Sequence, residues 1–158
     1  MAYHDDLIEH AILLSQYNLP NDPKQADLRR AVSATYYALF HLLTTEAAQN
    51  WKHQSQRIRF ARMFDHGRMK TCSSKVLSRP LPTDPAEILT ATDLRLVADS
   101  FVTLQQVRHA ADYDNSKVWS RAQVDDAIVQ AQNAMAAWMA IREEEMAQDY
   151  LFDLMGTR

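Results

Sequence analysis

Residues 29–43, with the sequence RRAVSATYYALFHLL, contain the densest apolar run of the chain, from Ala31 to Leu43. Small side chains at positions 31, 34 and 38 lie between the aromatic residues, so a neighbouring helix can approach this segment closely. We expect the run to form the centre of a helix over about residues 23–51, with Asp22 as its cap and Pro23 in its first turn.

Composition restricts the fold class around this segment. The chain has 158 residues, of which 47% are hydrophobic and 23% charged, as in one soluble globular domain. Its two glycines, Gly67 and Gly156, and five prolines are too few turn residues for a β-sandwich or barrel. Neither glycine lies in a GxGxxG or GxxxxGK motif, which excludes Rossmann and P-loop folds. We predict a single all-α domain over residues 1–158, with a core from about residue 5 to residue 150.

Prolines and polar clusters divide the chain into five predicted helices. They cover about residues 5–17, 23–51, 55–76, 86–113 and 121–154. Residues 78–85 include three prolines and form a predicted loop, and residues 114–116 form a predicted turn. Because most connections are short, we expect an up-and-down bundle of four to five helices.

Charge and cysteine content exclude several classes of protein. Seventeen Lys plus Arg against twenty Asp plus Glu give a net charge of -3, which argues against a strongly basic nucleic-acid-coating protein but allows a local basic patch. The single cysteine, Cys72, excludes an internal disulfide, and the lack of His/Cys pairs at ligand spacing excludes a structural zinc knuckle. Neither a metal nor a cofactor is predicted. No segment approaches the ~18 apolar residues of a membrane span. We therefore expect a cytoplasmic protein without membrane contact.

The most informative polar residues lie near the end of the fourth predicted helix. An apolar stripe with 3-4 spacing extends from Leu94 to Ala111, but Arg108 interrupts it, and Asp112 follows four residues later on the same face. A charge on a buried face is costly unless it is paired. Two interpretations stay open: a salt bridge within the fraying end of the helix, or a pair that a neighbouring helix receives.

Residues 29–41 offer candidate partners for this pair. Arg30, Tyr37 and His41 share one narrow face of the predicted helix, and Tyr36 lies on the adjacent face. Taken alone, each of these aromatic side chains is more typical of ordinary packing than of a site. Their coincidence with Arg108 on another predicted helix favours a shared polar site.

These two segments resemble the HEPN (higher eukaryotes and prokaryotes nucleotide-binding) superfamily of small helical domains. Residues 29–41 are similar to its RxAYYAxFH helix, and residues 108–114, RHAADYD, to its RxxADYD element. Residues 64–67, FDHG, occupy the region where relatives often carry a Lys-His-Gly-like helix start. The resemblance covers about residues 22–138 and implies a bundle of four to five helices, homodimerisation and a polar cleft between the two motif helices. The residues of this cleft would be Arg30, Tyr36, Tyr37, His66, Asp112 and Tyr113.

Many HEPN proteins are metal-independent endoribonucleases with an Arg-x(4–6)-His motif late in the bundle. Arg108 matches the arginine, but residues 113–115 are Tyr, Asp and Asn, so the histidine of the motif is missing. RNA cleavage by 2'-hydroxyl attack needs proton transfer and positive charge beside the phosphorane. In this chain Arg108 would supply the charge, and His109 or His41 would carry protons.

Three functions are therefore left open by the sequence. The first is a HEPN-like module that binds a nucleotide, RNA or a partner protein. The resemblance implies a minimal nucleotidyltransferase as that partner and a toxin–antitoxin or defence setting. The second is the endoribonuclease with Arg108 and His109 or His41, so whether the chain is an enzyme also stays open.

The third is a purely structural homodimeric interaction protein. Its dimer face would lie on the last predicted helix, at Ile128, Met135, Trp138 and Met139. The stripe Val124, Ile128, Ala131, Met135 and Trp138 is more typical of an ordinary core face. The acidic run Glu143–Glu145 on that helix is interpreted as a solvated face.

Overall fold

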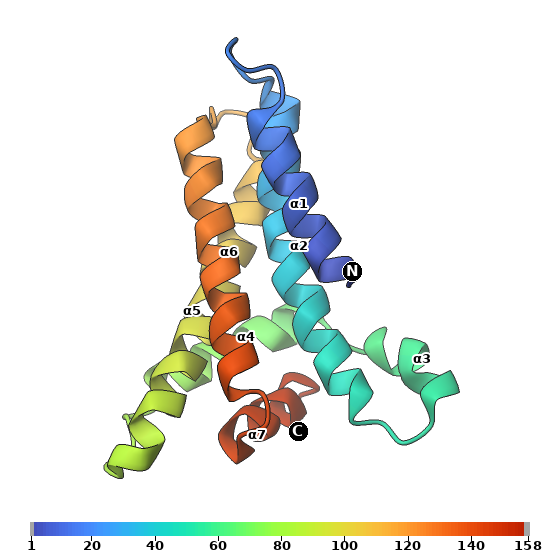
Figure 1. Cartoon of the computed structure of the whole chain (residues 1–158), viewed down its shortest axis with the longest axis vertical. Coiled ribbons are helices and arrows are strands. Elements are labelled where there is room, and N and C mark those ends of the chain that lie inside the picture. The colour runs from blue at the N-terminus through green and yellow to red at the C-terminus, as the bar shows by residue number, and fades with distance from the viewer. Residues whose placement is uncertain (1, 157–158) are drawn as a thin grey trace. The chain divides into compact units, whose positions relative to one another are not determined.

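The structure of the protein is a computed structural model that describes residues 2–156. The secondary structure of these residues consists of helices only, which confirms the predicted all-α class (Figure 1). The elements are α1 (Tyr3–Gln16), α2 (Gln25–Gln49), the 3-10 turn η1 (Gln54–Gln56), α3 (Arg57–Ala61), α4 (His66–Ser78), α5 (Pro85–Tyr113), α6 (Arg121–Ile141) and α7 (Glu145–Leu154). Seven α-helices thus occupy the described residues, where the sequence analysis expects five helices.

The predicted helix over residues 55–76 is wrong, because Asp65 divides it. Asp65 is in an extended conformation, and its side chain accepts a hydrogen bond of 2.9 Å from the backbone N–H of Arg68. This N-cap starts α4 at His66 and leaves α3 as a separate short helix.

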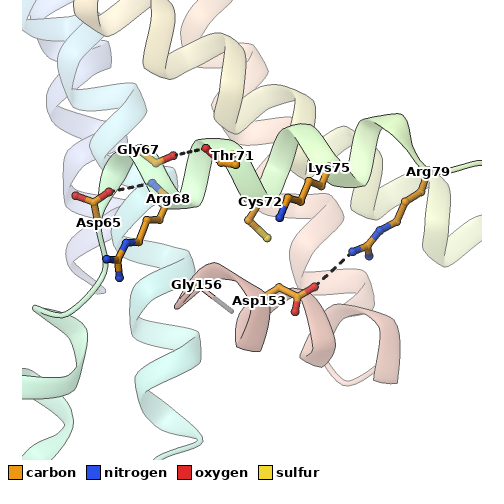
Figure 2. A pocket seen from close by; sticks show the side chains of 9 residues that line it. All are labelled: Asp65, Gly67, Arg68, Thr71, Cys72, Lys75, Arg79, Asp153 and Gly156. Atoms are coloured by element: carbon orange, nitrogen blue, oxygen red, sulfur yellow. Dashed lines mark hydrogen bonds and ion pairs between the residues drawn. The ribbon is translucent and has the colours of Figure 1, made fainter. Parts of the chain in front are cut away.

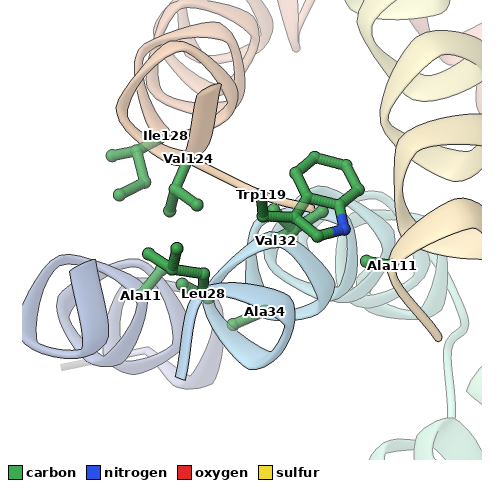
Figure 3. Packing of buried hydrophobic residues seen from close by; sticks show 9 residues of the cluster. Ala11, Leu28, Val32, Ala34, Ala111, Trp119, Val124 and Ile128 are labelled. Atoms are coloured by element: carbon green, nitrogen blue, oxygen red, sulfur yellow. The ribbon is translucent and has the colours of Figure 1, made fainter. Parts of the chain in front are cut away.

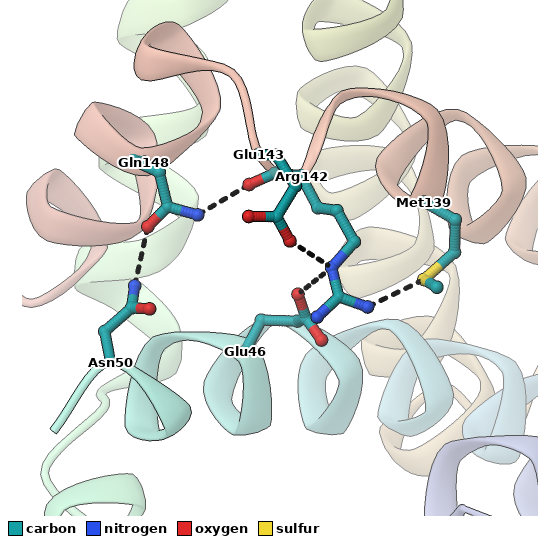
Figure 4. A network of polar contacts seen from close by, with 6 residues as sticks. All are labelled: Glu46, Asn50, Met139, Arg142, Glu143 and Gln148. Atoms are coloured by element: carbon teal, nitrogen blue, oxygen red, sulfur yellow. Dashed lines mark hydrogen bonds and ion pairs between the residues drawn. The ribbon is translucent and has the colours of Figure 1, made fainter. Parts of the chain in front are cut away.

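The predicted helix over residues 121–154 is also wrong, because the chain turns at Arg142 (Figure 4). Arg142 Nε lies 3.1 Å from a carboxylate oxygen of Glu46, which is 9% exposed, and 3.3 Å from one of Glu143. Glu144 is extended and precedes α7, which begins at Glu145. The acidic run therefore lies in this turn and at the start of α7, where the helix dipole favours negative charge, and not along a continuous helix face.

The described residues form two compact units. Residues 2–41 and 103–133 belong to unit 1, and residues 42–102 and 134–156 belong to unit 2. Helices α2, α5 and α6 contribute residues to both units.

In unit 1, parts of α1, α2, α5 and α6 surround an apolar cluster (Figure 3). Trp119, in the connection between α5 and α6, closes this cluster and is 3% exposed. The Gln25 side chain holds the backbone of Trp119 in place. Its amide nitrogen donates to the backbone carbonyl of Trp119, and its amide oxygen accepts from the backbone N–H of Trp119, both at 2.8 Å. The other members are Ala11, Leu28, Ala31, Val32, Ala34, Ala111, Val124 and Ile128.

In unit 2, Trp138 of α6 and Tyr150 of α7 are buried, with ring centroids 6.4 Å apart. The Tyr150 hydroxyl forms a buried hydrogen bond of 2.8 Å with Ser73 of α4, and burial raises the pKa of Tyr150. Since Trp138 and Ile128 are buried within the chain, each in its own unit, the ordinary-core interpretation of the α6 stripe is confirmed for these two residues. No helix among residues 2–156 has the length and apolar character needed to cross a membrane.

Candidate functional site

Arg108 of α5 contacts the two tyrosines of α2 within unit 1. Its guanidinium carbon lies 5.2 Å from the centre of the Tyr36 ring and 5.8 Å from that of Tyr37. These distances are within the range of a cation–π interaction. The structure thus brings together the arginine and the tyrosine pair that periodicity places on two separate helices.

Asp112 extends this contact by one turn of α5. Its Oδ2 lies 3.4 Å from Arg108 Nη1 and accepts a hydrogen bond from Ser33 Oγ of α2, also at 3.4 Å. The ion pair lies within α5, and α2 also receives it through Ser33. The helix end is not outside the core, because Ala111 is 2% exposed and belongs to the apolar cluster. Both polar contacts are longer than the 2.7–2.9 Å of a strong charge-assisted hydrogen bond.

The Arg108 guanidinium is poorly satisfied for its burial. Its side chain is 12% exposed, and its buried Nε has no hydrogen-bond partner among residues 2–156. A guanidinium carries five N–H donors, whereas Arg108 makes a single long polar contact. The guanidinium therefore keeps N–H donors that a further acceptor, such as an anion, can bind.

Arg29, which the sequence analysis does not select as a site residue, holds the end of α5. Its Nη1 donates to the Ala111 carbonyl at 2.7 Å, and its Nη2 donates to the carbonyls of Asp114 and Lys117 at 3.0 and 2.7 Å. A cation at the C-terminus of a helix satisfies free carbonyl groups and the helix dipole. Its neighbour Arg30 is exposed and has no hydrogen bond or ion pair within the described part of the chain.

The two candidate histidines differ in their relation to Arg108. His109 is exposed and pairs with Tyr113, with ring centroids 4.9 Å apart, on a face about 100° around α5 from Arg108. The centre of the His41 ring lies 6.2 Å from that of Tyr37, the same ring that Arg108 contacts. His41 is therefore the histidine that shares a neighbour with Arg108.

His66, the remaining predicted site residue, belongs to unit 2, where it is the first residue of α4. The contacts of Arg108 described above all lie in unit 1. Within residues 2–156, no group of three or more His, Cys, Asp or Glu side chains could hold a metal ion.

Unit 2 contains a hollow that the sequence analysis does not predict. It has a volume of about 680 Å³ and lies between α4 and α7, with Arg68, Lys75, Arg79 and Asp153 in its lining (Figure 2). The signal for it is local charge: residues 51–79 contain eight Lys or Arg and one acid, Asp65, in a chain of net charge -3.

Cys72 lines this hollow, and its thiol is expected to react slowly. Burial, followed by the charge of Asp153, raises the pKa of Cys72 from 9.0 to about 11. At pH 8 the thiolate fraction is then about 100-fold smaller than in the unfolded chain. We expect the rate of alkylation by iodoacetamide, followed by mass spectrometry, to rise with pH up to about 11. The urea-unfolded chain is the control, and a folded-state rate that levels off near pH 9 would contradict the shift.

Comparison of the chain with protein-family models, with curated protein sequences and with solved structures finds no match.

Proposed function

We propose that this protein is a HEPN-like helical module that binds the phosphate of a nucleotide at Arg108, where α2 contacts α5 in unit 1. The observation that carries the proposal is the state of the guanidinium, which covers two tyrosine rings but has one polar contact of 3.4 Å and an unpaired Nε. Phosphate, like carboxylate, matches the planar, multidentate donors of arginine.

The neighbours of Arg108 suit such a ligand. The contact between Arg108 and Asp112 is long, so a phosphate can replace the carboxylate without the loss of a strong hydrogen bond. Arg30, exposed and unpaired among the described residues, lies on the same face of α2 two turns before Tyr37, so its positive charge would reach a part of the ligand other than the phosphate at Arg108.

The family resemblance extends this proposal to fold and partners. In it, the chain adopts the HEPN-like up-and-down bundle of four to five main helices, forms a homodimer, and acts with a minimal nucleotidyltransferase in a toxin–antitoxin or defence system. RNA, as a polymer of nucleotides, belongs to the same class of ligand as the single nucleotide proposed above.

An endoribonuclease is the second candidate, because Tyr37 contacts both Arg108 and His41. In this alternative Arg108 stabilises the phosphorane and His41 transfers a proton. Incubation of the protein with single-stranded RNA in EDTA tests it. Cleavage that is lost in both Arg108→Gln and His41→Asn would favour the enzyme over a module that only binds.

Substitution of Arg108 by glutamine is expected to weaken nucleotide binding at least tenfold, because the loss of one charge-assisted interaction with phosphate costs about 1.5–3 kcal/mol. Isothermal titration calorimetry with the four nucleoside monophosphates measures the affinity. Lys24→Gln removes the same charge from an exposed position of unit 1 and should leave it unchanged. The proposal fails if Arg108→Gln keeps its thermal stability and binds every nucleotide as the wild type does.

A further inference from the structure

Positive charge is strongly segregated in the segment from η1 to the end of α4. Residues 51–79 have a formal charge of +7 from eight Lys or Arg and one Asp. The carboxylate of that acid, Asp65, caps α4 through the Arg68 N–H. Within the described chain, the only ion pair that includes one of these cations joins Arg79 to Asp153, at 3.7 Å. Ordinary solvated surfaces mix both signs of charge, whereas this segment carries eight cations and one acid.

Three of these cations line one hollow of unit 2. Arg68 and Lys75 project from α4 into the space beside α7, and Arg79 follows at the C-terminal end of the helix (Figure 2). Seven residues separate Arg68 from Lys75, which places them two turns and about 10 Å apart along the helix axis. A single phosphate is too small to contact both, whereas a chain of phosphates can.

An aromatic platform lies in the adjoining hollow of the same unit. This second hollow, of about 580 Å³, shares Arg68 and Gly156 with the first, and Trp51 and Phe60 are among its lining residues. The rings of Trp51 and Phe60 stack, with centroids 5.1 Å apart and planes at 25°. Trp51 nevertheless stays 43% exposed, so part of its indole is available for a further stacking partner.

We propose that these two hollows form one groove in unit 2 that binds single-stranded nucleic acid. The backbone phosphates follow Arg59, Arg68 and Lys75, and a base stacks on Trp51. A cationic groove beside an exposed aromatic ring is the usual combination in proteins that bind single strands without sequence preference. The proposal does not rest on the nucleotide site at Arg108, since every residue that it uses belongs to unit 2.

Fluorescence anisotropy with labelled 12-nucleotide single strands, oligo(U) and oligo(dT), tests the groove, with a duplex of equal length for comparison. We expect both single strands to bind more tightly than the duplex at 50 mM salt. The double variant Arg59→Gln/Lys75→Gln should bind them at least tenfold more weakly. Because each phosphate contact contributes about 0.7 to the salt slope for single strands, loss of two contacts should lower that slope by about 1.4. Both residues are exposed, so the variant should keep its melting temperature.

Single variants provide the matched controls. Lys75→Gln should weaken binding, whereas Lys24→Gln, the same change at an exposed position of unit 1, should not. Trp51→Leu should weaken single-strand binding about fivefold or more through lost stacking. The double variant Arg59→Gln/Lys75→Gln should leave mononucleotide binding at Arg108 unchanged, because both residues belong to unit 2, which separates this proposal from the previous one. Unchanged single-strand binding by the double variant would overturn the proposed groove. It would also be overturned if poly-glutamate displaced the labelled single strand as well as unlabelled single strand does, which would indicate an acidic protein partner.

Discussion

Replacement of Trp138 by alanine is expected to lower the free energy of unfolding by about 3–5 kcal/mol. Trp138 is fully buried in unit 2, with its ring 6.4 Å from that of Tyr150, so the substitution leaves a cavity that α6 and α7 cannot easily fill. Against a total stability of about 5–15 kcal/mol for a typical domain, the variant should be unfolded or close to it at 37 °C. Urea unfolding followed by circular dichroism measures the change.

Met139→Ala, one position along α6, is the matched control. Met139 is 51% exposed, so its substitution should change the free energy of unfolding by less than about 0.5 kcal/mol. Trp138→Phe should cost less than Trp138→Ala because the phenyl ring leaves a smaller cavity. Neither change breaks a hydrogen bond of the indole, whose buried N–H makes none within residues 2–156. If Trp138 belonged to a dimer face, Trp138→Ala would instead keep its fold and lower the mass measured by light scattering.

Helices α1 and α5 were predictable because their ends carry strong local signals, whereas the predicted start of α2 at Pro23, with Asp22 as its cap, is wrong, since α2 begins at Gln25. The predicted helix over residues 86–113 matches α5 within one residue, since prolines precede it and a polar turn follows it. The predicted helix over residues 5–17 matches α1 comparably well. In both cases the chain itself supplies the start and the stop.

The two missed breaks depend on weaker or more distant information. Asp65 precedes α4 as a good N-cap, but one capping residue within a helical pattern is common and rarely decisive. The turn at Arg142 includes a contact with Glu46, almost a hundred residues earlier in the chain. The sequence close to Arg142 does not include Glu46, so it gives no sign of this contact. The apolar spacing on both sides of the turn therefore led to the prediction of one continuous helix.

The residues of the candidate site were likewise predictable from the sequence only in part. Arg108 was predictable because it interrupts an apolar stripe, and the tyrosines of α2 because they lie on adjacent faces of one predicted helix. The role of Arg29 was not predictable, since its acceptors are backbone carbonyls that only the packed end of α5 brings within reach. The groove of unit 2 was not predicted because the net charge of the whole chain, -3, hides the +7 charge of residues 51–79 behind the acidic residues of the rest of the chain.

Replacement of Arg29 by methionine is expected to lower the free energy of unfolding by about 3 kcal/mol. One guanidinium donates to three carbonyls, at Ala111, Asp114 and Lys117, and a hydrogen bond to a charged group contributes about 1.5–3 kcal/mol. The three contributions are not additive, because part of the carbonyl surface regains water in the variant. Arg29→Lys should recover only part of the loss, since an ammonium lacks the planar fork that reaches several acceptors.

Arg30→Met is the matched control, with the same change one residue along α2 at an exposed side chain that has no partner among the described residues. It should change stability by less than about 0.5 kcal/mol. Hydrogen exchange locates the effect: Arg29→Met should raise the exchange of amides in residues 111–119, whereas Arg30→Met should not. Equal stability of the two variants would contradict the capping role. Arg29 holds the end of α5 that carries Arg108 and Asp112, so Arg29→Met should weaken nucleotide binding only to the extent that it raises amide exchange in residues 111–119. Arg108→Gln, by contrast, should weaken nucleotide binding and leave exchange in residues 111–119 unchanged.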